Sequence, residues 1–220
     1  MGTFVVHPDG ATLAPMVIFL MDAPGKRPLL HDMARRLAGN GYYVMLPNLY
    51  YRTTSAFELD FLSKESFEHM VELMSNIGNR AVARDVGALL AQAHLDGAAD
   101  ETTVGCVGYC MSGPFALWAA AEHADVMRAA ASFYGVRLHV DADDSPHTRL
   151  DSVAGELYIS AAEYDDYVPL EMVDRFEAAM QDTDVAGRVE RYWGTHHGFA
   201  FDDRPAYNRR ADNRHWAAML

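Results

Sequence analysis

Short apolar runs alternate with amphipathic stretches along most of the chain. A continuous apolar run closed by turn residues is typical of a strand buried on both faces of a sheet, whereas apolar positions three and four apart predict a helix. On these patterns, we expect strands at residues 4–7, 16–21, 42–46, 102–107, 129–134, 157–160 and 188–193. We expect helices at residues 29–37, 65–74, 80–95, 113–123, 169–180 and 206–220.

The alternation of strands and helices predicts an α/β fold, with a mainly parallel sheet and helices on both faces. We see no internal repeat and no linker rich in proline, glycine or serine, so we expect a single domain over residues 1–220. Residues 50–79 contain one predicted helix and no clear strand. This excursion either helps to shape a pocket at the carboxyl edge of the sheet, as a lid would, or simply connects two elements.

Composition and charge exclude several classes of protein. Half of the 220 residues are hydrophobic, and the formal net charge of -13 would repel a nucleic-acid backbone. No apolar run is long enough to cross a bilayer, and the first residues lack the pattern of a signal peptide. Two cysteines close together in sequence do not form a secreted disulfide framework, so we expect a cytoplasmic protein with no membrane association.

The most informative stretch is residues 108–113, Gly-Tyr-Cys-Met-Ser-Gly, between a predicted strand and a predicted helix. This is the arrangement of a nucleophile elbow, a strained turn that projects one side chain above the end of a strand. Gly108 and Gly113 would provide the space that such a turn needs. We predict that Cys110 is the nucleophile, activated by the N-terminus of the following helix, and that Cys106 is a buried strand residue.

A thiol nucleophile needs a base, and the base needs an acid that fixes its tautomer. Asp165 and Asp166 follow the predicted strand at residues 157–160, and are both candidates for the acid. His196 and His197 follow the last predicted strand, and are both candidates for the base. Nucleophile, acid and base therefore occur in the order that α/β hydrolases use.

The three segments resemble those of the dienelactone hydrolases, as does the Pro-Asn-Leu-Tyr sequence at residues 47–50. The resemblance covers about residues 16–201 and implies the α/β-hydrolase fold with a cysteine nucleophile. The family spacing Asp-x-x-Val-Pro selects Asp165 over Asp166, and His-x-Phe selects His197 over His196. The resemblance therefore implies a Cys110–His197–Asp165 triad.

The chain departs from the family pattern at three positions. Asp22 stands where the family has a glutamate that contacts the resting thiol, and Ser112 replaces a glycine of the elbow. Phe201 stands where an arginine helps to hold the substrate carboxylate. The candidate substitutes for that arginine are Arg52, Arg80 and Arg204. Each of them also fits a solvated charge on the surface.

These residues together predict a hydrolase of small activated esters or lactones. Cys110 would attack the acyl carbonyl, and backbone N–H groups of Met111 and Ala23 would stabilise the oxyanion. His197, oriented by Asp165, would activate water to cleave the thioester. A thiolate is a good leaving group, so enol esters, enol lactones, aryl esters and thioesters fit better than amides.

We expect no cofactor and no metal site, because the adjacent histidines diverge and no spaced His/Glu pair accompanies them. The expected partner is a small ester or lactone, and the chain would be a monomer or a weak homodimer. Two alternatives use the same fold. One is a thiol-based redox protein, and the other is a binding module that has lost catalysis.

Overall fold

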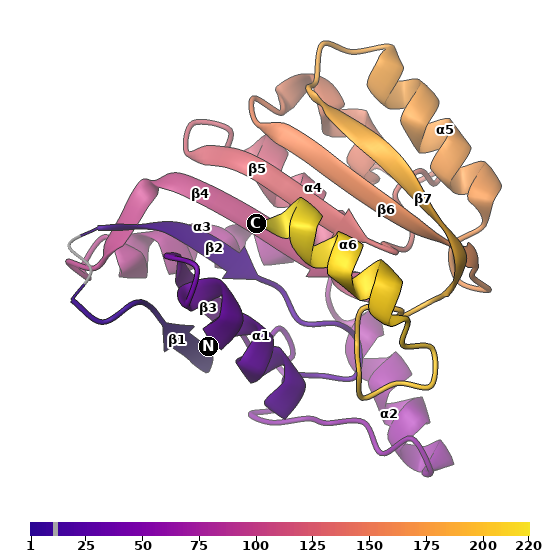
Figure 1. Cartoon of the computed structure of the whole chain (residues 1–220), viewed down its shortest axis with the longest axis horizontal. Coiled ribbons are helices and arrows are strands. Elements are labelled where there is room, and N and C mark those ends of the chain that lie inside the picture. Colours follow the sequence, from indigo (N-terminus) through magenta and orange to yellow (C-terminus); the bar gives the residue numbers. More distant parts are fainter. Residues whose placement is uncertain (11–12) are drawn as a thin grey trace.

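A twisted sheet runs through the part of the chain that the structure describes, which is residues 1–10 and 13–220 of this computed structural model (Figure 1). Its strand order among these residues is β1-β3-β2-β4-β5-β6-β7. β1 is antiparallel to β3, and every other neighbouring pair is parallel. The strands are Thr3–Val6 (β1), Ala14–Phe19 (β2), Tyr43–Pro47 (β3), Ala99–Tyr109 (β4), Met127–Phe133 (β5), Glu156–Tyr164 (β6) and Gly187–His196 (β7).

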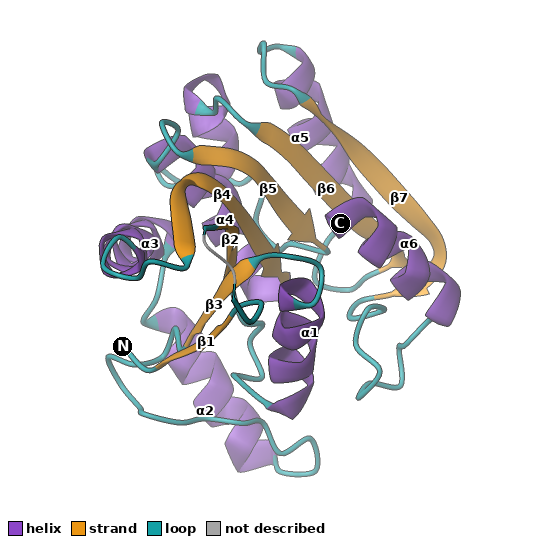
Figure 2. Ribbon diagram, turned by 60° about the vertical axis from the view of Figure 1, so that its left-hand side comes forward, coloured by secondary structure: helices purple, strands orange, loops and turns teal. Residues whose placement is uncertain are grey.

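Helices cover both faces of the sheet, as the alternating pattern predicts. α1 and α6 lie on one face, and α3, α4 and α5 lie on the other (Figures 1 and 2). α2 lies apart from both layers, near the carboxyl ends of the strands. The helices are Pro28–Ala38 (α1), Lys64–Ser75 (α2), Asn79–Ala93 (α3), Gly113–Glu122 (α4), Leu170–Gln181 (α5) and Arg209–Met219 (α6). The predicted α/β architecture is confirmed.

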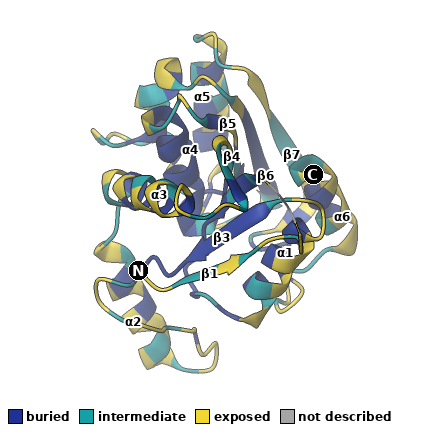
Figure 3. Ribbon diagram, turned by 90° about the vertical axis from the view of Figure 1, so that its left-hand side faces the viewer, coloured by how far each residue is buried: buried dark blue, intermediate teal, exposed yellow. Residues whose placement is uncertain are grey.

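The most buried elements are the ones whose sequences are apolar throughout. All five residues of β3 are buried, and so are the first nine of α4, whereas the edge strand β1 is partly exposed (Figure 3). A helix that is apolar all round is stable only inside a core. α4 meets this condition because it packs against β4, β5 and α3. The nucleophile elbow is therefore joined to one of the most deeply buried helices of the molecule.

Several element boundaries differ from the sequence prediction by a few residues, and the structure explains two of these differences. The terminal helix begins at Arg209 rather than at 206, because the Asn208 side chain accepts hydrogen bonds from the backbone N–H groups of Arg210 and Ala211. β4 begins at Ala99, three residues earlier than expected, and its polar start pairs with β2 ahead of an irregularity in register. Polar residues at 100–103 conceal this extension from a hydrophobicity pattern.

The sheet brings the ends of β4, β6 and β7 to one edge. Cys110 follows β4 directly, Asp165 follows β6 and His197 follows β7. Loops at the carboxyl ends of parallel strands are the usual site of ligand binding in such sheets. The three predicted residues are thus gathered by the topology, although 55 and 32 residues separate them along the chain.

Candidate active site

Cys110 occupies the strained position of a sharp turn between β4 and α4. Its φ of 53° lies in the left-handed region, which costs a residue with a side chain of the order of 1–3 kcal/mol. A Cβ atom at Gly108 would collide with the Ser112 carbonyl, and one at Gly113 would collide with Gly135. Both glycines are therefore needed for the close approach of backbone that defines the elbow, as the sequence predicts.

Ser112 fastens the elbow to the end of β2. Its hydroxyl accepts a hydrogen bond from the Tyr109 N–H at 2.9 Å and lies 3.2 Å from the Leu20 carbonyl oxygen. The side chain is fully buried, so the serine in place of the family glycine is accommodated as a structural bridge. Cys106 lies inside β4, where burial raises the pKa of its thiol. This buried thiol is poorly placed to serve as the second cysteine of a redox pair.

Asp165 and His197 form a direct pair. The imidazole Nδ1 of His197 lies 2.7 Å from the Asp165 Oδ2, and the Asp165 carboxylate is completely buried. The other oxygen of that carboxylate accepts hydrogen bonds from the backbone N–H groups of Tyr167 and Val168. Asp166 is exposed and makes no comparable contact. The structure thus brings together the two residues that the family spacing selects.

The electrostatics of His197 connect it to the candidate nucleophile. Burial alone would lower its pKa, but hydrogen bonding and charge from Asp165 and Cys110 outweigh burial and raise it to about 10. The Nε2 atom is buried and has no conventional hydrogen-bond partner among the described residues. The atom that a general base would use is therefore free of other partners in the described part of the chain, and the contribution of Cys110 to the pKa of His197 indicates that the two side chains are close.

Ala23 and Met111 lie on either side of the Tyr50 hydroxyl. This hydroxyl donates a hydrogen bond to the Ala23 carbonyl at 2.8 Å and lies 3.4 Å from the Met111 sulfur. Neither the Ala23 nor the Met111 N–H donates to another residue in the described part of the chain. Tyr50 belongs to the Pro-Asn-Leu-Tyr segment, so that segment links the two loops whose amides were predicted to form the oxyanion hole.

Asp22 lies in a ring of four charged side chains, which we call the arginine–aspartate ring: Asp22, Arg27, Asp203 and Arg204. Arg27 Nη1 lies 2.5 Å from one Asp22 oxygen, and Arg204 Nη2 lies 2.8 Å from the other. Arg27 also binds Asp203 at 2.6 Å through Nε. Burial opposes the charge on Arg27, but the two aspartates outweigh it and raise its pKa. Both oxygens of Asp22 are engaged, and its contact with the resting thiol stays a prediction.

Phe201 lies beneath this ring. The guanidinium carbons of Arg27 and Arg204 lie 5.0 and 5.9 Å from the centre of its aromatic ring. The position where the family has an arginine thus supports two other arginines through cation–π contacts.

The other two candidate substitutes for the family arginine are engaged elsewhere. Arg52 makes a two-nitrogen contact with Asp85, and Arg80 packs on Trp118. Neither lies free to hold a substrate carboxylate.

The sequence did not predict the roles of three residues at the site. These residues are Arg27, Tyr134 and Tyr50, which links two loops. Tyr134 packs edge-on against the His197 ring at 4.9 Å, and its buried hydroxyl has no hydrogen-bond partner within the described ranges.

Arg27 precedes a proline at the start of α1, where an arginine is usually a surface charge. Asp22 lies five residues earlier in the same loop, but Asp203 is 176 residues away, and the burial of Arg27 depends on that distant loop, which no local signal reveals.

The described residues contain no group of three or more histidine, cysteine, aspartate or glutamate side chains arranged to hold a metal ion. They also contain no helix with the length and apolar composition that a membrane span requires.

The fold and the placement of these residues define an α/β hydrolase with a nucleophile elbow. The family model of the dienelactone hydrolase family matches residues 1–220, and the chain belongs to this family of hydrolases. A Synechocystis protein with the provisional name carboxymethylenebutenolidase is 27% identical over 216 residues, which cover 97% of this chain and 87% of that protein.

Two further relatives agree with this assignment. A Bradyrhizobium protein with the provisional name 2-oxo-3-(5-oxofuran-2-ylidene)propanoate lactonase is 27% identical to this chain. The match covers 99% of this chain and 86% of that protein. A crystal structure from Klebsiella pneumoniae, titled provisionally as a dienelactone hydrolase, superposes with a TM-score of 0.86 at 22% identity. That superposition covers 99% of this chain and 90% of the other, and it confirms the predicted α/β-hydrolase fold.

Proposed function

We propose that the protein hydrolyses small activated esters or lactones through Cys110, His197 and Asp165, with a thioester intermediate. The observation that carries the proposal is the coupled geometry of the base. His197 is held by a buried carboxylate at 2.7 Å, its other nitrogen has no partner among the described residues, and Cys110 contributes to its raised pKa. This is the relation between nucleophile, base and acid that triad chemistry requires.

The reaction starts with a protonated His197 near Cys110, which attacks as a thiolate. Because the pKa of His197 is raised to about 10, the imidazole carries a proton at neutral pH and stabilises negative charge on the sulfur. The thiolate adds to the carbonyl carbon, and the C=O electrons move to oxygen. The Met111 and Ala23 N–H groups, which have no acceptor among the residues that the structure describes, would donate hydrogen bonds to this oxyanion.

The tetrahedral adduct collapses with cleavage of the bond to the leaving group. The leaving oxygen or sulfur takes the proton of His197, which becomes neutral, and the acyl group remains on Cys110 as a thioester. Neutral His197 then removes a proton from water, which adds to the thioester carbonyl. Expulsion of the Cys110 thiolate releases the acid and restores the ion pair with His197.

The choice of thiolate limits the substrate. In the first adduct, the sulfur and the substrate oxygen compete to leave, and the sulfur leaves readily. The adduct therefore proceeds only when the substrate's own leaving group is stabilised, as in aryl esters, enol esters, enol lactones and thioesters. An amide or an alkyl alkanoate would return to reactants.

The test is hydrolysis of p-nitrophenyl acetate by the wild type and by Cys110→Ala, His197→Ala and Cys106→Ala, with intact-protein mass spectrometry. We expect turnover to fall by about a thousandfold or more in the first two variants. Cys106→Ala is the matched control, because its thiol is buried in β4 away from the elbow, and we expect it to retain activity. A rapid quench should trap one acetyl group on Cys110. Absence of turnover and of adduct in folded, reduced protein would contradict the proposal.

A further inference from the structure

The imidazole of His197 contacts two tyrosine rings. The Tyr134 ring packs against it with ring centres 4.9 Å apart, and the Tyr167 ring packs against it at 5.1 Å. The two tyrosines differ in burial, since Tyr134 is 1% exposed and Tyr167 is 62% exposed. Tyr134 therefore forms an inner wall beside the base, and Tyr167 forms a wall on the side that faces solvent.

The backbone of Tyr167 is held by the same carboxylate that orients the base. Its N–H donates to Asp165 Oδ1 at 2.9 Å, while Asp165 Oδ2 lies 2.7 Å from His197 Nδ1. The next residue, Val168, is buried and donates its own N–H to Asp165 Oδ1 at 3.1 Å. The positions of the tyrosine and the base are thus tied together through Asp165.

Most of the Tyr167 side chain is not used by the protein itself. Its hydroxyl makes no hydrogen bond with any residue in the described ranges, and its ring contact there is with the His197 imidazole. Tyrosine offers a large and rigid contact surface, because only two side-chain angles have to be fixed. An exposed tyrosine ring that touches the base is therefore a ready surface for a planar group of the substrate.

The position of the leaving group follows from the proton that it must receive. In the proposed reaction, the leaving oxygen takes the proton of His197, so it must come within hydrogen-bond distance of Nε2. The other ring nitrogen, Nδ1, is engaged by Asp165. The group attached to the leaving oxygen therefore lies next to the His197 ring, where Tyr167 is the solvent-facing neighbour. The acyl group stays on Cys110 and does not have to meet this condition.

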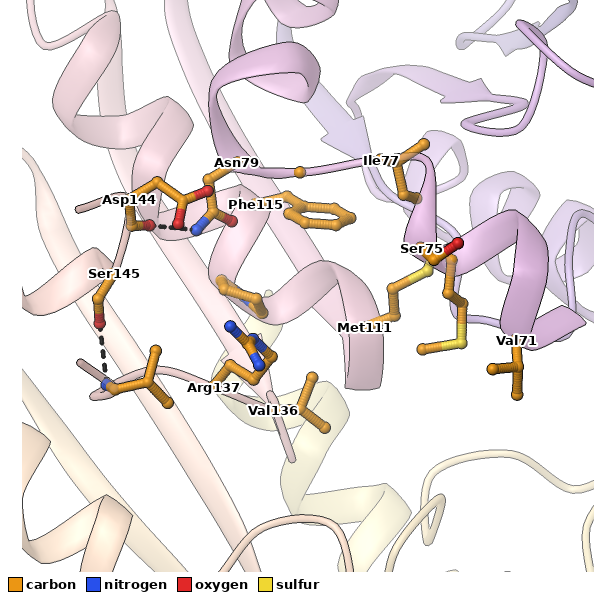
Figure 4. A pocket seen from close by; sticks show the side chains of 14 residues that line it. Val71, Ser75, Ile77, Asn79, Met111, Phe115, Val136, Arg137, Asp144 and Ser145 are labelled. Atoms are coloured by element: carbon orange, nitrogen blue, oxygen red, sulfur yellow. Dashed lines mark hydrogen bonds between the residues drawn. The ribbon is translucent and has the colours of Figure 1, made fainter. Parts of the chain in front are cut away.

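A cavity of about 360 Å³ beside the elbow does not meet this condition either. Its walls come from α2, the starts of α3 and α4, and the loop after β5, and it shares Met111 with the candidate active site (Figure 4). The described residues that line it do not include His197, Asp165 or Tyr167. A group in this cavity would lie beside a proposed oxyanion amide rather than beside the base. The cavity therefore does not compete with Tyr167 for the leaving group.

We propose that Tyr167 determines specificity by stacking on an aryl leaving group, so that the preferred substrates are esters of phenols. The inference rests on the proposed hydrolase function, and it adds the class of leaving group. Two aromatic rings in an offset-stacked or edge-to-face arrangement attract each other beyond the effect of the area that they bury. The chemistry is unchanged: the C–O bond to the phenol breaks, and the phenol oxygen takes the proton of His197.

The test compares two acetate esters whose leaving groups have similar acidity but different aromatic area, 2-naphthyl acetate and phenyl acetate. Both would leave the same acetyl group on Cys110. After correction for reactivity with a small thiol, we expect kcat/KM of the wild type to favour the naphthyl ester by about three- to tenfold. Tyr167→Leu, which keeps apolar bulk but removes the ring, should lower this ratio to about one, and Tyr167→Phe should retain it.

Tyr164→Leu is the matched control. The Tyr164 side chain is similarly exposed, at 55%, but it packs on His196 instead of the base, so this variant should retain the ratio. A ratio that Tyr167→Leu leaves unchanged would overturn the role of Tyr167, even if both rates fell. Damage to His197 alone would slow the two esters alike and would not change their ratio.

Binding of a stable amide separates this inference from the proposed function. N-(2-Naphthyl)acetamide, measured by calorimetry, should bind the wild type about three- to tenfold more tightly than Tyr167→Leu, and N-cyclohexylacetamide should show a smaller difference. This result without ester turnover would support the aryl site and contradict the hydrolase proposal. Ester turnover with a ratio that does not depend on Tyr167 would overturn the aryl site and leave the hydrolase proposal standing.

Discussion

Two buried aspartates near Cys110, Asp165 and Asp22, are satisfied in different ways. Asp165 accepts two backbone N–H groups from its own loop and one imidazole N–H from the next strand's loop. Asp22 accepts from two guanidinium groups, one five residues away and the other 182 residues away. Asp165 thus belongs to a local turn and has one long-range partner, His197, which titrates. Asp22 belongs to an ion-pair ring whose arginines keep their charge.

The difference separates two tasks that a buried carboxylate can perform. Asp165 holds one ring in one orientation, so its loss should affect chemistry more than folding. Asp22 balances one buried and one partly buried cation, so its loss should affect folding more than chemistry. The predictions below test this division, beginning with the largest effect.

Asp165→Asn should lower kcat/KM on an activated ester by about 10³- to 10⁴-fold, because an amide cannot hold His197 in the same tautomer and protonation state. Steady-state hydrolysis of p-nitrophenyl acetate measures the loss, and urea unfolding checks that the variant remains folded. Asp166→Asn is the matched control, since that side chain is exposed, and it should behave as wild type. Equal losses of kcat/KM in both variants would contradict the assignment of Asp165 as the acid that orients His197.

Asp22→Asn should destabilise the protein by about 3–5 kcal/mol, because it leaves buried Arg27 and partly buried Arg204 without a shared counter-charge. The change is measured as the free energy of unfolding in urea. Asp32→Asn removes an exposed ion pair with Arg35 and should cost less than about 1 kcal/mol. If Asp22→Asn left stability unchanged but abolished catalysis, the two aspartates would not divide their tasks as described.

Arg27→Lys should destabilise by about 1.5–3 kcal/mol, the usual value of a hydrogen bond to a charged group. Lysine keeps the charge, but it cannot reach Asp22 and Asp203 through two separate nitrogens as the guanidinium does. Arg204→Lys should cost less, because that side chain is more exposed, at 18% against 3% for Arg27. The ranking of the two variants in urea unfolding is the measurement, and a reversed ranking would count against this account of the ring.

The pH dependence of stability between pH 7 and 8.5 should come from His197, the titrating partner of Asp165. The pKa of folded His197 is raised to about 10, above the value of about 6.5 for an unfolded histidine. The stability that its charge contributes is therefore complete below about pH 6.5 and is lost as the pH rises toward 10, by up to about 1.4 kcal/mol per pH unit.

Above about pH 8.5 the buried Cys106 thiol, whose pKa is raised by burial, adds to the loss. Unfolding measured between pH 7 and 8.5 should show the His197 slope in the wild type and in Asp22→Asn. A slope that persisted in His197→Gln would assign it to another group.

The predictability of the site follows the same division. Cys110, Gly108 and Gly113 form a local pattern between a strand and a helix, so the sequence predicts both the turn and its steric requirements. The choice of Asp165 and His197 over their neighbours needed the family spacing, since the residues alone left both pairs open. The structure places Asp165 against His197 and leaves Asp166 exposed.

The arginine–aspartate ring could not be predicted. Arg27 lies only five residues from Asp22 in the loop before α1, but a lone arginine there resembles a surface charge. The ring closes only because the distant loop that carries Asp203 and Arg204 approaches this one. The helix in residues 50–79 was expected, but its place near the carboxyl ends of the strands (Figure 1) depends on long-range packing that a hydrophobicity pattern does not give.

The order of the proposed triad along the chain also implies a consequence for biosynthesis. His197 is translated 87 residues after Cys110, which at about 5–20 residues per second is a delay of roughly 4–17 s. A cysteine in an unfolded chain has a pKa of about 8.5, so at neutral pH most of it is protonated. If His197 is the base, as we propose, Cys110 becomes reactive only when the last strand joins the sheet.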